Sequence, residues 1–250
     1  MVAPSRNVET PARRGSFLGI ALLMAIFAVA GFWPTYWGPL VDGALDLHWL
    51  LHLHGVVFTL WLVLLIAQTA LVSRGRTLVH QKLGTYVGVF WGLLVIAVGL
   101  AAVFGRISPA IGSEFESLQG FVQLLPVGGG DIIGFAVLFG AGIAYRKRPA
   151  VHKRLMILST AVLLPAAAAR IAGMVPIPGV IVVFAAPLLF VALAMGYDWW
   201  GERRVHPTYL LGGAFVLLLE ARFFFIFSES WQNLSGRISE SLETVLKPLM

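Results

Sequence analysis

Three of the six histidines of this chain lie close together at the start of an apolar segment, HWLLHLHGVVFTLW at residues 48–61. His48 and His52 are four residues apart and would share one face of a helix, whereas His52 and His54 diverge by about 200°. Two imidazoles one helical turn apart, completed by carboxylates from other segments, are typical ligands of Zn, Mn or non-haem Fe. Haem is less expected, because ligation by two imidazoles needs a histidine from a second helix at the same depth.

Other ionisable side chains lie inside apolar segments, where they are costly and tend to face the interior of a helical bundle. At 1.5 Å of rise per residue, we expect them and His52 and His54 to lie about 5 to 10 Å below one membrane surface. They are Asp131, Arg170, Glu220 and Arg222. A shared depth on four helices predicts one polar pocket. Glu220 and Arg222 are also two residues apart, so on an ideal helix their side chains would diverge in the same way as those of His52 and His54.

These residues define the candidate site. In an enzyme His54 would be a base or metal ligand, Asp131 an orienting carboxylate and Arg170 the group that holds substrate charge. Arg170 and Glu220 would bind a cofactor, and a metal ion would be held by His48, His52, His54 and Asp131. The alternative is that each group only pairs with a neighbour, such as Arg170 with Asp131 or Glu220, since polar contacts commonly join spanning helices.

Glycine and proline accompany two of these residues. The sequence GGGD at residues 128–131 is expected to give a flexible start to a spanning helix and so to place Asp131. Pro165 removes a backbone hydrogen bond and is expected to kink a helix five residues before Arg170.

The remaining histidines, His80, His152 and His206, each stand near the start of a predicted helix on the other side of the membrane. Three imidazoles from three helices could bind a metal ion. Thirteen Lys and Arg residues are expected on that face, however, and their field repels cations and attracts phosphate. Anionic lipid headgroups or other anions therefore suit this face better.

The composition excludes most soluble classes of protein. Of the 250 residues 58% are hydrophobic and only 12% are charged, and the mean hydropathy is +0.86, which is typical of a polytopic membrane protein in a lipid bilayer. The chain has no cysteine, which excludes disulfides, thiolate metal sites and cysteine nucleophiles. The formal charge of +6 falls in short segments between apolar runs, so we expect no nucleic-acid partner. The oligomeric state is left open.

Seven segments approach the 20 or so apolar residues that a membrane-spanning helix needs. We expect spans at 17–33, 49–72, 84–104, 128–145, 155–175, 179–200 and 208–227. The fold class is therefore all-α, with a transmembrane helical bundle over residues 1–227. Residues 228–250 form a tail with an apolar stripe at helical spacing, expected to lie flat at the membrane interface or to pack over the loops.

The distribution of basic residues predicts the orientation. Lys and Arg alternate between hydrophilic segments, with thirteen on one side and Arg106 alone in the opposing loops. By the positive-inside rule the N-terminus is cytoplasmic and the C-terminus periplasmic. The first apolar segment follows Arg13 and Arg14 and contains Ala28-Val29-Ala30, so a cleaved signal peptide is an alternative to a retained span.

The motifs resemble those of a family of uncharacterised bacterial inner-membrane proteins. The resemblance lies in His52-Leu53-His54-Gly55, Gln68, Arg74-Gly75-Arg76 with His80 and Leu83-Gly84, His152-Lys153-Arg154-Leu155-Met156, Ala169-Arg170 and His206-Pro207. The His-Lys-Arg-Leu-Met element is also distantly similar to membrane proteins associated with haem-copper oxidase assembly. The resemblance implies a bacterial inner-membrane location and gives some weight to redox or cofactor handling.

The sequence thus predicts an integral membrane protein with an intramembrane His/Asp/Arg pocket on the periplasmic side, which binds a metal ion or a small polar ligand. Membrane oxidoreduction or cofactor handling is the first functional hypothesis. A transporter or permease in which the same residues bind a solute or proton is the second, and a structural or assembly protein without a site is the third.

Overall fold

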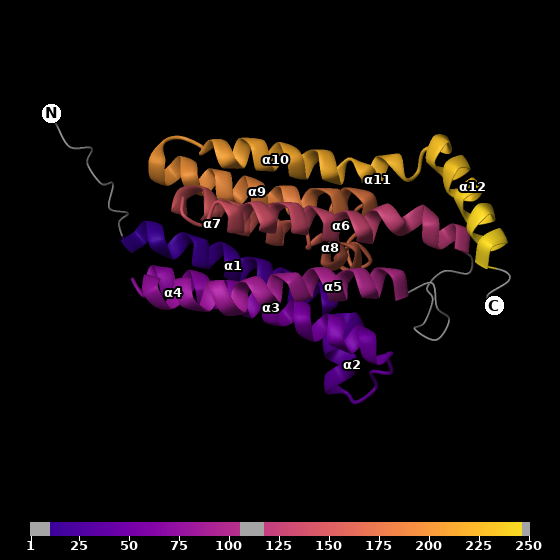
Figure 1. The fold of residues 1–250 in the computed structure, drawn as a ribbon, viewed down its shortest axis with the longest axis horizontal. Helices are drawn as coiled ribbons and strands as arrows, with labels where there is room; N and C mark the ends of the chain where they lie inside the picture. Colours follow the sequence, from indigo (N-terminus) through magenta and orange to yellow (C-terminus); the bar gives the residue numbers. More distant parts are fainter. Residues whose placement is uncertain (1–10, 106–117, 247–250) are drawn as a thin grey trace.

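The protein is an all-helical bundle with seven helices long and apolar enough to cross a membrane, as the composition predicts. The computed structural model describes residues 11–105 and 118–246, and helices but no strands occur there (Figure 1). The seven candidate spans are Phe17–Val41, Trp49–Ser73, Thr77–Gly105, Leu118–Ala144, Pro149–Ala172, Gly179–Gly201 and Pro207–Phe225. Arg106 lies outside the described residues.

Four of the spans contain more than one helical element. The first consists of α1 (Pro11–Phe32), η1 (Trp33–Trp37, a π-helix) and α2 (Gly38–Val41). The third consists of α4 (Thr77–Leu83), η2 (Gly84–Gly88, a π-helix) and α5 (Val89–Gly105). The fifth consists of α7 (Pro149–Ala161) and α8 (Pro165–Ala172), and the seventh of α10 (Pro207–Glu220) and α11 (Arg222–Phe225).

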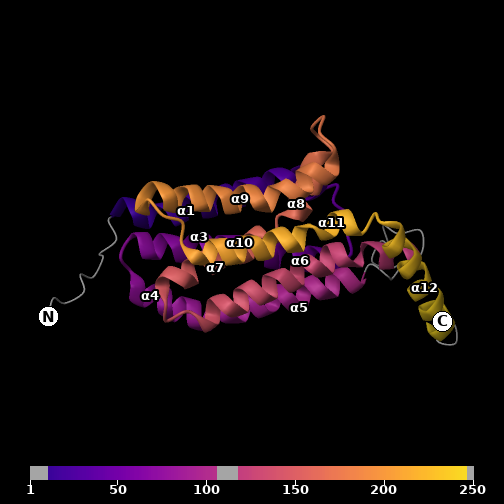
Figure 2. The ribbon, with the colours of Figure 1, turned by 90° about the horizontal axis from the view of Figure 1, so that it is seen from above.

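The second, fourth and sixth spans are the continuous helices α3 (Trp49–Ser73), α6 (Leu118–Ala144) and α9 (Gly179–Glu202). Short connections at residues 74–76, 145–148 and 203–206 join successive spans at one end of the molecule. The helices run along its long axis (Figures 1 and 2). One end of the bundle, called here the basic end, carries exposed basic residues in its turns: Arg74, Arg76, Arg146, Lys147, Arg148, Arg203 and Arg204. The opposite end carries η1, α2 and α11.

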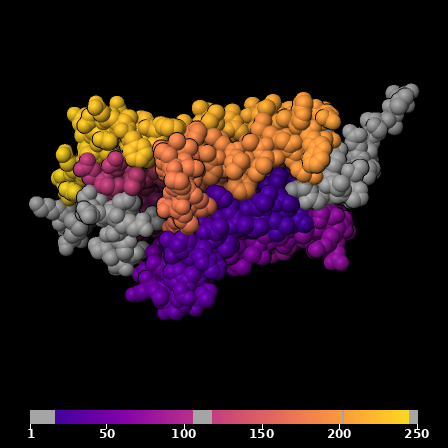
Figure 3. All heavy atoms as spheres, turned by 180° about the vertical axis from the view of Figure 1, so that it is seen from behind, coloured from indigo at the N-terminus to yellow at the C-terminus, as the bar shows by residue number. Residues whose placement is uncertain are grey.

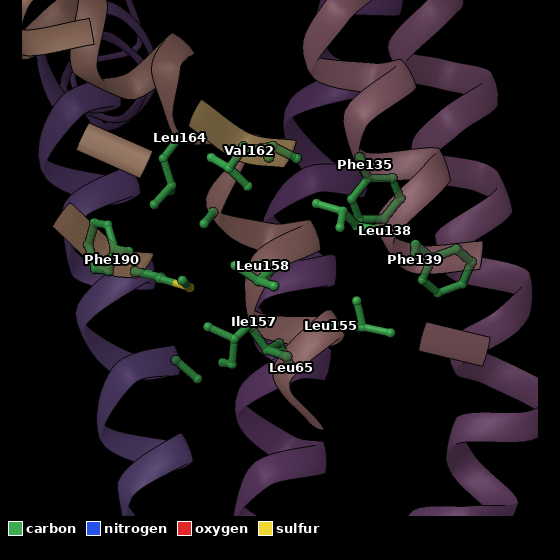
Figure 4. Close-up of a cluster of buried hydrophobic side chains, with 14 of the residues drawn as sticks. Leu65, Phe135, Leu138, Phe139, Leu155, Ile157, Leu158, Val162, Leu164 and Phe190 are labelled. Atoms are coloured by element: carbon green, nitrogen blue, oxygen red, sulfur yellow. The ribbon is translucent and has the colours of Figure 1, made fainter. Parts of the chain in front are cut away.

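The fifth span lies at the centre of the bundle. It is the most buried of the seven, and α7 contacts α6, α10, α9 and α1. Figure 4 shows the resulting core, where Leu158 of α7 and Val162 just after it face Phe135 and Phe139 of α6. Helices α1 and α8 approach closely because small residues meet there. A Cβ at Gly31 would lie only 2.6 Å from the carbonyl oxygen of Ala167, so no larger residue fits. Small residues favour such close helix packing in lipid.

Pro165 interrupts the central span, as predicted. It has no N–H with which to bond the carbonyl of Ala161, and the amide of Leu164 donates to that carbonyl instead, at 3.1 Å. The tightened turn at residues 162–164 ends α7, and Pro165 then begins α8 at a position that favours proline.

The predicted start of the fourth span at residue 128 was wrong. Helix α6 begins at Leu118 and continues through Pro126 and residues 128–130. Asp131 therefore lies 13 residues into the helix, about 20 Å from its start rather than the predicted 5 Å. Gly and Pro are tolerated inside spanning helices because neighbouring groups satisfy the freed backbone, so glycine here does not mark a helix end.

Two elements project from the bundle. The first span continues into a lobe formed by η1 and α2 at the side of the molecule (Figures 1 and 3). Helix α12 (Glu229–Leu246) follows α11, at the end opposite the basic end, and packs against the first turns of α6. There Trp231 donates from Nε1 to the carbonyl of Gln123 at 2.9 Å. The face of α12 that is buried carries Ser235 and Ser239, while Leu234 of the predicted apolar stripe is exposed.

A buried ion pair joins α7 to α9 near the basic end. Arg154 donates from Nε and Nη2 to the two carboxylate oxygens of Asp198, both at 2.7 Å, and from Nη1 to the carbonyl of Ala150 at 2.6 Å. Arg154 is only 1% exposed and Asp198 5%. The sequence places Arg154 among the basic residues of a loop, whereas it lies inside a helix and holds two spans together.

Replacing Arg154 with Met is expected to destabilise the folded protein by about 3–5 kcal/mol, because it leaves a buried carboxylate unpaired. Replacing both residues, Arg154→Met with Asp198→Leu, should recover most of this loss. Denaturant titration of the detergent-solubilised protein measures both, with the exposed Arg148→Met as control. A double variant no more stable than Arg154→Met would contradict this account.

Candidate functional site

Two buried carboxylates share one arginine between α6 and the junction of α10 and α11. Arg222, the first residue of α11, donates from Nη2 to Oδ1 of Asp131 on α6. Its Nη1 lies 3.5 Å from Oε1 of Glu220, the last residue of α10. The same guanidinium donates to the carbonyl of Leu219 at 2.7 Å and to that of Val127 at 3.3 Å. These five residues form the acid cluster.

The seventh span is interrupted between the two charged residues. Helix α10 ends at Glu220 and α11 begins at Arg222, so Ala221 forms a turn between them. The prediction that two-residue spacing separates Glu220 from Arg222 was therefore wrong, because the angle of 200° holds only on an uninterrupted helix.

Gly130 makes room for Arg222. A Cβ at this position would lie 2.7 Å from Nε and 2.9 Å from Cδ of Arg222, closer than such atoms approach one another. All three glycines before Asp131 lie inside α6 rather than at its start. Gly130 alone among them allows the Arg222 guanidinium to pass close to the helix backbone.

The acid cluster carries more negative than positive charge. The side chains of Asp131 and Arg222 are 10% and 11% exposed, and that of Glu220 is fully buried. Neither carboxylate oxygen of Glu220 accepts a hydrogen bond from any described residue. Two carboxylates against one guanidinium leave one negative charge in a buried setting, which is costly unless it is neutralised. The arrangement is suited to bind one further positive charge.

A second group of the predicted site residues gathers around η1. Arg170 donates from Nε to Oγ1 of Thr35 at 3.0 Å, and its guanidinium lies 4.2 Å from the ring centre of Phe32. His52 Nδ1 lies 3.5 Å from the hydroxyl of Tyr36. Tyr36 also lies across the backbone of Gly55. The π-helix WPTYW thus links the predicted residues of α3 and α8.

His48 and His54 have separate surroundings. His48 caps the start of α3, where its Nδ1 accepts from the amide of Leu50 at 3.2 Å. The ring of His54 stacks on Phe58 at 4.0 Å between ring centres. His48 and His52 thus make different contacts, although they stand one helical turn apart.

The predicted polar layer therefore consists of separate groups. Asp131 and Glu220 belong to the acid cluster, whereas Arg170 and His52 belong to the surroundings of η1. Within residues 11–105 and 118–246 no three His, Asp or Glu side chains are placed so that they could hold a metal ion. Metal or haem binding by the predicted set His48, His52, His54 and Asp131 stays a prediction, as do the catalytic roles of His54, Asp131 and Arg170.

Arg222 was predicted to lie in the polar layer but was given no role in the site, because two-residue spacing on a continuous helix separates it from Glu220. The charge of Arg222 could have indicated its role. An arginine two residues from a glutamate inside an apolar segment is expected to neutralise that glutamate. Thr35 and Tyr36 gave no such signal, since neither is ionised at neutral pH.

Comparisons with known proteins add no further constraint. No protein-family model, curated protein or solved structure matches this chain. The resemblance of its motifs to bacterial inner-membrane proteins and to oxidase assembly proteins therefore stays a prediction, and the functional argument rests on geometry.

Replacing Gly130 with Ala is expected to destabilise the protein by about 1–3 kcal/mol relative to Gly129→Ala, because the added methyl group displaces Arg222 from Asp131. Gly129 is a matched control, since the nearest side-chain atom to a Cβ there is 3.9 Å away. Both variants gain the same helix propensity, so the difference in free energy of unfolding in detergent isolates the contact. Equal stabilities would contradict the role given to Gly130.

Proposed function

We propose that this integral membrane protein is a permease for a small monovalent cation, H⁺ or Na⁺, and that the acid cluster is its binding site. The observation that carries the proposal is Glu220, a fully buried carboxylate without a hydrogen-bond donor among the described residues, beside a second carboxylate and a single arginine. Either a proton or a monovalent cation would neutralise the surplus charge, and carboxylate oxygens suit both.

The backbone around the acid cluster supports the proposal. The two helices that carry Glu220 and Arg222 meet at Ala221, and the helix that carries Asp131 contains Pro126 and three consecutive glycines. Interrupted helices at the depth of charged groups are a common feature of transporters, where helix ends and unwound backbone bind the passing ion.

A second buried polar cluster lies nearer the basic end on the same face of α10. Tyr209, Gly212, Val216 and Glu220 are the buried residues of this helix. The hydroxyl of Tyr209 has no hydrogen-bond partner in the described part of the chain, and its ring lies 5.6 Å from the guanidinium of Arg154. The buried face of α10 therefore carries a polar side chain near each of its ends.

An apolar layer separates the two clusters. Leu158 of α7 packs against Gly212, and Val216 is buried on the next turn of α10 towards Glu220. Hydrophobic constrictions of this kind close pores by excluding water. We therefore interpret the structure as a closed state, in which the acid cluster lies on one side of the layer.

The surface charge supports an orientation. Basic residues at the turns of the basic end are exposed, which favours a cytoplasmic position for this end and contact with anionic lipid headgroups. In this orientation the N-terminus is cytoplasmic, the C-terminus is periplasmic and the acid cluster lies nearer the periplasm. A bacterial inner membrane is the location that we propose.

Flux into liposomes tests this function. Purified protein is reconstituted into liposomes with an enclosed pH indicator, and a K⁺ diffusion potential is imposed with valinomycin. Wild-type protein should accelerate acidification, or the uptake of isotopically labelled Na⁺ if the site takes Na⁺. Glu220→Gln should reduce this rate to that of protein-free liposomes, because a neutral side chain removes the surplus charge.

Glu229→Gln is the control, since this carboxylate is exposed at the start of α12 and should leave the flux unchanged. Wild-type protein that carries neither cation faster than empty liposomes, or Glu220→Gln protein with wild-type flux, would refute the permease.

A further inference from the structure

Two of the histidines near the basic end lie close together, on different helices. The ring centres of His80 on α4 and His152 on α7 are 6.2 Å apart. Both side chains are half-buried. His206 belongs to a different cluster, because it caps α10 and its backbone amide donates to Asp198 at 3.3 Å.

The hydrogen bond of His152 leaves one ring nitrogen available as a ligand. Its Nδ1 lies 2.7 Å from the carbonyl oxygen of Gly142. A carbonyl oxygen only accepts, so Nδ1 carries the proton and the lone pair of the neutral ring is on Nε2. This is the arrangement of most metal-binding histidines, which donate their second ring N–H to a backbone carbonyl or a carboxylate.

Gln68 of α3 holds the other imidazole. With its amide assigned from its hydrogen bonds, Gln68 donates to His80 Nδ1 at 2.5 Å and to the carbonyl of His80 at 3.2 Å, and accepts from the amide of Gly84 at 2.9 Å. His80 then carries its proton on Nε2. A rotation of the Gln68 amide by half a turn would present its oxygen to Nδ1, so that the proton could move there and free Nε2.

We propose that His80 and His152 bind one divalent transition-metal ion through their Nε2 atoms, with Gln68 as a positioning residue that sets the tautomer of His80. Imidazole ligands suit Zn, Cu and Ni ions. With metal–nitrogen distances of about 2.0–2.1 Å, two ring centres lie roughly 5 to 6 Å apart, depending on the angle at the metal. The observed separation of 6.2 Å lies slightly above this range. Water would complete the coordination on the exposed side.

One of the basic residues nearest to His152 is neutralised, because Arg154 is bound to Asp198. Lys153, whose ammonium group lies 4.6 Å from the ring centre of Phe17, and Arg146, which donates to the carbonyl of Ile143 at 3.1 Å, keep their charge. A metal ion at this point would therefore bind against part of the repulsion expected from the basic residues. This site is independent of the acid cluster and goes beyond the proposed permease.

The test is calorimetric titration of chelator-treated protein with ZnCl₂, in detergent and with a purification tag that lacks histidine. Wild-type protein should bind one Zn²⁺ per chain. His80→Ala and His152→Ala should each weaken binding at least about tenfold, the order of effect seen for groups that tune metal sites. His206→Asn is the matched control, because Asn also caps helices, and it should bind as the wild type does.

Gln68 gives a test of the direction of the effect. Gln68→Glu should strengthen Zn²⁺ binding about tenfold, since a carboxylate only accepts and so fixes the proton on Nδ1 of His80. A gain in affinity cannot arise from misfolding. Wild-type protein without Zn²⁺ binding, unchanged affinity in both histidine variants, or weaker binding in Gln68→Glu would overturn the proposal.

Discussion

The neutralisation of buried charge at Arg222 is the interaction on which the functional account depends. One guanidinium contacts Asp131 on α6 and Glu220 on α10, and so connects the fourth and seventh spans, which the fifth and sixth separate in sequence. In a low-dielectric interior a charge without a counter-charge costs several kcal/mol. Two acids and one base therefore make the protonation or cation occupancy of this point part of the stability of the fold.

The helix breaks have a common physical explanation. Ala221 separates α10 from α11 at the acid cluster, and Pro165 separates α7 from α8 in the centre of the bundle. Each break costs backbone hydrogen bonds that lipid cannot replace. Pro165 is buried in the bundle, whereas Ala221 is exposed and lies between Glu220 and Arg222. Continuous helices such as α3 lack such a break and contribute packing.

The fold could be predicted from the sequence because apolar length decides it. About 20 apolar residues span a bilayer whatever their order, and the seven predicted segments correspond to the seven spans observed. The break at Pro165 was also predictable, since its chemistry is local.

The site was less predictable, because it depends on tertiary contacts that periodicity does not encode. Gly128, Gly129 and Gly130 are locally indistinguishable from a helix start, and only the position of Arg222 explains the last of them. A shared depth in the membrane predicted that Arg170 lies beside Asp131. In the structure Arg170 instead donates to Thr35. Arg154 was assigned to a loop because neighbouring basic residues obscured its pairing with Asp198.

Infrared spectroscopy of carboxyl groups tests the central claim most directly, because it detects a protonated carboxylic acid inside the protein. In Na⁺-free buffer at neutral pH, wild-type protein should show the carbonyl band of one buried protonated carboxyl group. The band should disappear in Glu220→Gln and equally in Asp131→Asn, since removal of either acid leaves one carboxylate opposite Arg222. A spectrum without this band in the wild type, or a band that persists in both variants, would contradict the account.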